Sequence, residues 1–100
     1  MAFSSFTPNA DATVNLTAGV ASTNVALPAA GEQLRLYNAH TATVFYELGT
    51  SSASTAATTT GVPLPAGAVE VISVGPQHTY LAAIAASGSG TLYATKGNGF

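Results

Sequence analysis

The chain contains no cysteine, and this absence excludes several classes of function together. Without a thiol there is no disulfide, no thiolate metal site, no cysteine nucleophile and no dithiol redox centre. A fold of this length must therefore be held together by its core and its hydrogen bonds alone. The lack of cysteine leaves the compartment open.

Charged residues are also scarce: they make up 6% of the 100 residues, against roughly a quarter in an average globular domain. Arg35 and Lys96 are the only arginine and lysine, whereas a groove that follows a phosphate backbone needs several clustered cations. We therefore expect no nucleic-acid partner. A surface of Ser, Thr, Asn, Gly and Ala gives little charge repulsion and suits a protein that is covered by other protein.

Long apolar runs are missing as well. No stretch of about 18 or more apolar residues occurs, so the sequence predicts no transmembrane helix and no membrane partner. The first residues, MAFSSFTPNAD, contain neither the basic region nor the apolar region of a signal peptide. We expect synthesis in the cytosol.

The sequence does contain short alternating segments, of which residues 27–48 give the clearest signal. Residues 33–38 and 44–48 alternate between apolar and polar side chains, as half-buried strands do. The intervening Asn38-Ala39-His40-Thr41 is polar, so the pattern predicts a β-hairpin. In that hairpin Arg35 and Glu47 would lie near each other as a weak cross-strand pair.

Further segments follow at spacings of about ten residues, which predicts seven or eight short antiparallel strands. Residues 68–74 are apolar on both faces and are expected to form a central strand, while residues 58–62 could add an edge strand that Pro63 ends. Leu81–Ala86 has helical propensity, but its surroundings favour a strand. We predict one all-β domain, a β-sandwich or jelly-roll-like barrel over residues 12–100, with an N-terminal arm at residues 1–11 and an exposed loop at residues 49–61.

Residues capable of catalysis do not form a recognisable constellation. Two carboxylates could form a glycosidase pair, but the spacing of the four acids does not support one. His40 and His78 are far apart, and each lies in or beside a predicted turn without clustered carboxylates. Neither a Gly-x-Ser-x-Gly elbow nor a phosphate-binding loop occurs. We predict no enzyme, no cofactor and no metal site. The four acids are Asp11, Glu32, Glu47 and Glu70.

Aromatic side chains in polar surroundings are the candidates for contacts with other proteins. On the arm and at the C-terminal tail they would reach a neighbouring subunit, although those on the arm could equally fold back over their own core. The predicted interface residues are Phe3, Phe6, Tyr37, His40, Tyr46 and Phe100.

Two longer stretches carry a resemblance: GEQLRLYNAHTATVFYELGT and GVPLPAGAVEVISVGPQHTYLAAIAASGSGTLYATKGNGF. Over residues 27–100 the chain resembles small proteins encoded in the structural gene regions of tailed bacteriophages. The shared features are LRLYN, the following Val44-Phe45 and the corner PLPAGAVE, with His40 at a position that is usually glycine.

This resemblance implies a virion component made in the host cytoplasm. The leading expectation is a capsid decoration, or cement, protein on the capsid exterior. Its partners would be the major capsid protein and copies of itself, as a dimer or trimer. The alternative is a carbohydrate- or receptor-binding module on a tail or head fibre, with exposed tyrosines as stacking platforms.

Overall fold

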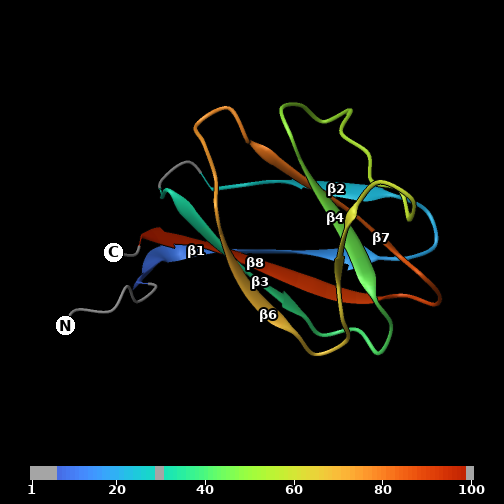
Figure 1. Cartoon of the computed structure of the whole chain (residues 1–100). Coiled ribbons are helices and arrows are strands. Elements are labelled where there is room, and N and C mark those ends of the chain that lie inside the picture. Colours follow the sequence, from blue (N-terminus) through green and yellow to red (C-terminus); the bar gives the residue numbers. More distant parts are fainter. Residues whose placement is uncertain (1–6, 29–30, 99–100) are drawn as a thin grey trace.

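The computed structural model describes residues 7–28 and 31–98. Within these ranges the chain forms eight strands and no helix, arranged as two four-stranded antiparallel sheets (Figure 1). The prediction of an all-β fold is confirmed. In spatial order, sheet A contains β1 (Thr7–Ala18), β8 (Gly90–Asn98), β3 (Gln33–Asn38) and β6 (Val69–Ser73). Sheet B contains β2 (Thr23–Ala26), β7 (Tyr80–Ala85), β4 (Val44–Gly49) and β5 (Val62–Leu64).

The strand pairs are nested along the chain. β1 pairs with β8, β2 with β7, β3 with β6 and β4 with β5, as in one long hairpin. This hairpin is rolled up, so that β3 also pairs with β8, and β4 with β7. The result is a jelly roll, a double-sheet sandwich of eight strands built from Greek keys.

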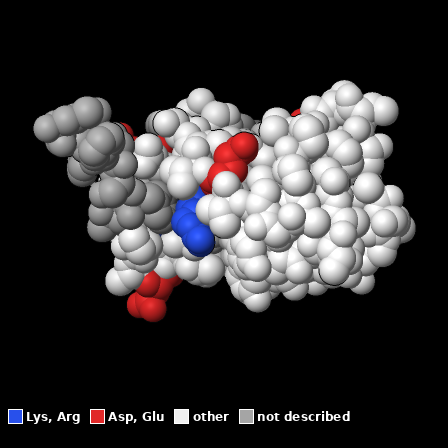
Figure 2. Space-filling model, turned by 60° about the horizontal axis from the view of Figure 1, so that its bottom comes forward, with Lys and Arg blue, Asp and Glu red and all other residues white. Residues whose placement is uncertain are grey.

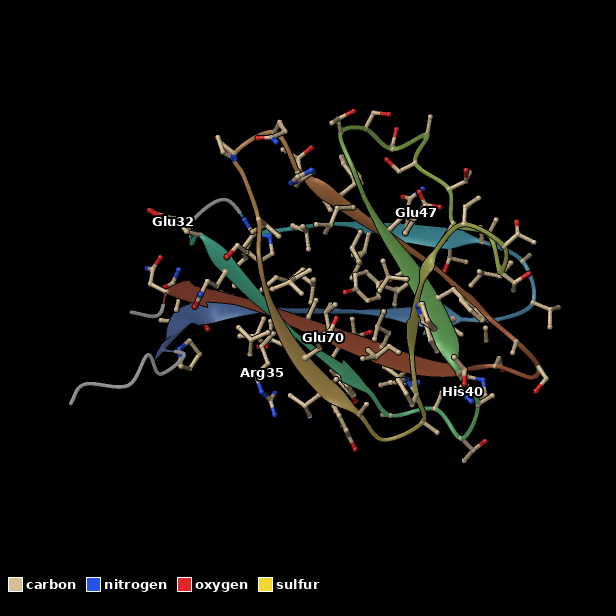
Figure 3. The ribbon with its side chains drawn as sticks, in the orientation of Figure 1. Glu32, Arg35, His40, Glu47 and Glu70 are labelled. Atoms are coloured by element: carbon tan, nitrogen blue, oxygen red, sulfur yellow. The ribbon has the colours of Figure 1, made fainter. Side chains whose placement is uncertain are left out.

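The predicted hairpin between residues 33–38 and 44–48 is wrong. Both segments are strands, but β3 belongs to sheet A and β4 to sheet B, so the turn at residues 39–43 crosses the sandwich. Alternation shows only that each strand is half-buried, and a short turn can join two sheets as readily as two neighbours. Arg35 and Glu47 therefore lie on opposite sides of the molecule (Figure 3), and Glu47 instead accepts a hydrogen bond from Thr60 at 3.2 Å.

Several predicted boundaries also change. β6 is an edge strand rather than a central one, because Val69 and Val71 lie on the open face and are 49% and 44% exposed. Pro63 lies inside the edge strand β5, where a missing donor is tolerated. β1 begins at Thr7, so residues 7–11 of the predicted arm belong to sheet A, and residues 1–6 lie outside the described residues.

The core fills the space between the two sheets. Both sheets contribute alternate apolar residues of their strands, which pack as one cluster and exclude water from the interior. Its fully buried larger members from sheet A are Leu34, Leu36 and Leu92, and those from sheet B are Val44, Leu64 and Leu81.

The Gly49–Gly61 segment does not project freely into solvent, because it packs on the outer face of sheet B. Asn24 of β2 donates hydrogen bonds to the carbonyls of Ser52 and Ser54, at 2.9 and 3.0 Å. Ala82 alternates with core residues of β7 and so points outward, yet it is 0% exposed. The loop thus covers sheet B and leaves the outer face of sheet A open.

Candidate interaction surface

The open face of sheet A carries a pair of tyrosines at its centre. The strand register places Tyr37 of β3 opposite Tyr93 of β8, with Asn15 beyond Tyr93 and Val69 beyond Tyr37. The two phenol rings are nearly parallel, with 6.1 Å between centroids and 15° between planes. The tyrosines are 36% and 38% exposed, so this row presents aromatic and aliphatic surface to a partner.

The neighbouring row contains the only charge in the two rows. Arg35 is flanked by Thr95 on β8 and Val71 on β6, and Thr13 of β1 completes the row. The hydroxyls of Thr13 and Thr95 are 2.8 Å apart, which fixes their orientation. Figure 2, seen from the side of sheet A, shows one blue patch with red beside it and another red patch at the lower edge, on an otherwise uncharged surface. The face therefore combines apolar groups, hydroxyls and one guanidinium.

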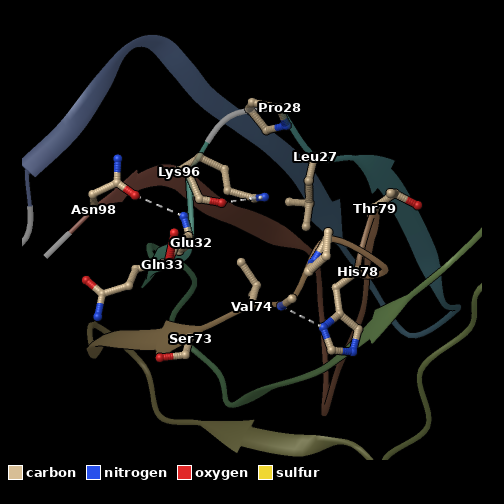
Figure 4. A pocket seen from close by; sticks show the side chains of 13 residues that line it. Leu27, Pro28, Glu32, Gln33, Ser73, Val74, His78, Thr79, Lys96 and Asn98 are labelled. Carbon is tan, nitrogen blue, oxygen red and sulfur yellow. Dashed lines mark hydrogen bonds between the residues drawn. The ribbon is translucent and has the colours of Figure 1, made fainter.

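A second feature is an open pocket of about 1070 Å³ at one end of the sandwich (Figure 4). Lys96 lines it, is 4% exposed, and donates from Nζ to the carbonyl of Gly31 at 3.3 Å. His78 accepts a hydrogen bond at Nδ1 from the amide of Gly75 at 3.2 Å. Since these side chains bond to the backbone rather than to each other, they do not form the nucleophile–base pair that covalent catalysis requires.

No group of three or more His, Cys, Asp or Glu side chains suited to a metal ion occurs among the described residues. Glu32 lies at the rim of the pocket, and its backbone amide donates to the Asn98 side chain at 3.2 Å. In this pocket the side chains of Lys96, His78 and Asn98 thus bond to the backbone. The open face of sheet A is the stronger candidate for function.

The structure places the predicted interface residues in different environments. Tyr37 lies on the open face, as an interface residue should. Tyr46 and His40 are 4% and 7% exposed, so neither can contact a partner in this fold, and we correct both assignments. They are buried because β4 turns Tyr46 into the core and the turn at residues 39–43 folds His40 against the start of β8. Phe3, Phe6 and Phe100 lie outside the described residues.

Tyr46 links the two sheets from inside. Its hydroxyl donates to Oε1 of Glu70 at 2.5 Å, which joins β4 of sheet B to β6 of sheet A. Burial, the hydrogen bond to Glu70 and the charge of that carboxylate, in this order, raise the pKa of Tyr46 above its ordinary value of 10.0. The phenol therefore stays protonated in the folded state when it ionises in the unfolded chain.

This shift predicts a loss of stability at alkaline pH. A phenol whose pKa is higher in the folded state than in the unfolded state contributes its full stabilisation at pH values below the unfolded pKa. This stabilisation is lost as the pH rises from the unfolded pKa towards the folded pKa. Between pH 10 and pH 11 the free energy of unfolding should fall by about 1 kcal/mol more in the wild type than in Tyr46→Phe. Urea denaturation at both pH values measures this difference, and equal slopes in the two proteins would contradict it.

The sequence alone left Tyr93 open as a core or a contact residue, and it did not point to Val69 and Val71 as surface candidates. The pattern of residues 68–74 puts Val69 and Val71 on one face, but it predicts a central strand, in which both faces would be buried. Tyr93 lies between Leu92 and Ala94 in the last strand, a pattern that fits a core residue as well as a surface residue. Only the pairing of β3 with both β6 and β8 brings these residues to Tyr37.

No protein-family model, curated protein sequence or solved structure matches this chain. In the part of the chain that the structure describes, there is no helix of the length and apolarity needed to cross a membrane.

Proposed function

We propose that this protein is a structural component of a bacteriophage virion, a capsid decoration protein that binds the outer shell through the open face of sheet A. The observation that carries this proposal is the exposed face around Tyr37, Tyr93, Val69 and Val71, with Arg35 as the one charge in its two central rows. The resemblance of residues 27–100 to small structural-region proteins of tailed bacteriophages supports the same assignment. Jelly rolls are also common among viral capsid domains, although they serve lectins and cupins too.

The chemistry of the face fits permanent attachment to another protein. Aromatic residues and arginine are enriched at interfaces, whereas most other charges are depleted from their centres. Burying this face removes one guanidinium and few other charges from water. The desolvation cost therefore offsets little of the free energy gained by burying apolar surface. A protein bound only to the assembled shell stabilises that state by mass action, which is what a cement protein does.

The proposal predicts that removing the two tyrosines strongly weakens binding to the shell. The Tyr37→Ala/Tyr93→Ala double variant should bind expanded capsids at least about 100-fold more weakly, because central interface tyrosines contribute about 2 kcal/mol or more. The measurement is co-sedimentation with expanded capsids of the phage that encodes the chain. Val20→Ala is the control, since Val20 is 70% exposed in the turn between β1 and β2. Unchanged binding of the folded double variant would refute the proposed face.

The exposed tyrosine pair also supports a second candidate, a carbohydrate-binding module. Sugar rings stack on exposed aromatic faces, and Tyr37 and Tyr93 offer two such groups at the centre of an open sheet. The number of copies per particle separates the candidates: a decoration protein covers the shell in many copies, while a fibre module is confined to a few.

A further inference from the structure

The sandwich has four edge strands, and three of them are protected against pairing with another chain. β1 has a register shift between Pro8 and Thr13, with Asp11 at φ 55°. β5 contains Pro63, and β2 has four residues and is tied to the loop that covers sheet B. Bulges, prolines, short strands and covering loops are the usual protections of sheet edges.

In the part of the chain that the structure describes, β6 has no bulge, no proline and no covering loop, and it is longer than β2 and β5. Its five residues, VEVIS, contain no proline, glycine or lysine, and they pair with β3 in an unbroken register. The one charged residue, Glu70, points into the sandwich, where it accepts the hydroxyl of Tyr46. β6 is therefore a regular and mainly apolar edge.

The hydrogen bonds between β6 and β3 show which backbone amides and carbonyls of β6 point towards β3 and which point away from it. The amide of Val74 donates to the carbonyl of Glu32 at 2.9 Å, and the amide of Asn38 donates to the carbonyl of Ala68 at 3.0 Å. In an antiparallel ladder every second residue bonds to the same neighbour. The even-numbered residues 68 to 74 thus face β3. The amides and carbonyls that point away from β3 are those of Val69, Val71 and Ser73.

We propose that β6 pairs antiparallel with β6 of a second copy of this chain, with Val71 opposite the partner's Val71. In this register Val69 lies opposite the partner's Ser73, and Ser73 opposite the partner's Val69. All three outward-pointing residues then exchange both backbone hydrogen bonds, which registers shifted by two residues do not allow. The pairing is self-complementary about a twofold axis, as a closed dimer requires.

The side chains agree with this register. Val69 and Val71 lie on the open face, so the pairing adds apolar contact around the axis. Arg35 and the partner's Arg35 are separated by two strands, or about 14 Å, which exceeds the Debye length of about 8 Å at physiological ionic strength. In the dimer the two A sheets form one continuous eight-stranded sheet, whose open face has twice as many strands as that of one subunit. It does not depend on the proposed function, but it would give a decoration protein a bivalent surface.

The absence of cysteine allows a sharp test, in which Val71→Cys and Val69→Cys variants of the full chain are oxidised and run on a non-reducing gel. Directly opposed residues of a bonded pair have Cα atoms about 5.5 Å apart, within disulfide range. Val71→Cys should therefore cross-link to a dimer. Val69→Cys should not, because the two Val69 positions are four residues apart along the paired strands, about 13 Å. Cross-linking of neither variant, or of both equally, would overturn the proposal.

Sedimentation equilibrium gives an independent measurement. Val71→Lys should raise the dimer dissociation constant at least about 100-fold, because it places two ammonium groups at the axis. The matched control is Val20→Lys, which adds the same charge to an exposed turn away from β6. A wild type that remains monomeric up to millimolar concentration, or equal effects of the two lysine variants, would refute the edge pairing.

Discussion

Asn38→Asp should destabilise the protein by about 3–5 kcal/mol at neutral pH, which is a large part of the stability of a typical domain. Asn38 is 0% exposed and terminates β3. Its side-chain amide donates to the carbonyls of Ala42, Leu64 and Pro65 at 3.0, 2.9 and 3.2 Å. Aspartate has the same shape but no donor, so a buried carboxylate would face three carbonyl oxygens.

The cost is large because Asn38 joins two corners of the jelly roll. Its Oδ1 accepts the backbone amide of His40 at 2.9 Å, which shapes the turn from β3 to β4. Its Nδ2 holds the carbonyls at the end of β5, where the chain crosses to β6. The substitution therefore loosens both crossings between sheet A and sheet B, and buried carbonyls lose their donor.

The effect of Asn38→Asp has a defined pH dependence. Burial among carbonyl oxygens should raise the pKa of the new carboxyl above the unfolded value of about 3.9. The unfolded state then ionises first, so the destabilisation is smallest below about pH 4 and grows as pH rises towards neutrality.

Urea denaturation of the wild type and the variant at pH 4 and pH 7 measures this dependence. Thermal melting should show a decrease of at least about 12 °C at pH 7. Asn15→Asp is the control, because Asn15 is exposed on β1 and should shift stability by less than about 0.5 kcal/mol. Equal effects of the two substitutions would show that Asn38 is not the link described above.

The sequence predicts the strands of this fold better than it predicts their partners. Alternation predicts β3 and β4, because one face of each strand contacts the core and period two is a local property. Pairing is not local: β3 lies between β8 and β6, which are far from it in the chain. The polar turn at residues 39–43 fits a hairpin within one sheet as well as a connection from one sheet to the other.

The same limit applies to the candidate surface. The polar setting of Tyr37 and Tyr46 suggested that both contact a partner, but the phase of each strand sends the first to solvent and the second to the core. The bond from Tyr46 to Glu70 joins strands of different sheets, so no spacing in the sequence predicts it. A surface assembled from four strands becomes visible only when the register is known.

Gly90→Ala should destabilise the protein by about 2–3 kcal/mol through a single steric conflict. A Cβ atom at residue 90 would lie 2.5 Å from Cγ of His40 and 2.8 Å from its Cβ and Cδ2. The imidazole cannot move freely, because Nδ1 accepts the amide of Ala42 at 3.0 Å and the backbone amide of His40 donates to Asn38. Overpacking of a buried site typically costs about 1–3 kcal/mol.

The conflict with His40 can be separated from any other effect of the added methyl group. In a His40→Gly background, Gly90→Ala should cost less than about 0.5 kcal/mol more, because both the ring and the Cβ atom of His40 that the new methyl group meets are gone. Gly19→Ala is the matched control, since its nearest neighbours would be 3.8 Å away and the substitution should be neutral or slightly stabilising. Chemical denaturation of the four proteins of the double-mutant cycle gives the coupling energy. A coupling energy near zero would mean that Gly90 is needed for a reason other than the side chain of His40. A value of about 2 kcal/mol would show that this glycine allows the turn between the sheets to close against β8.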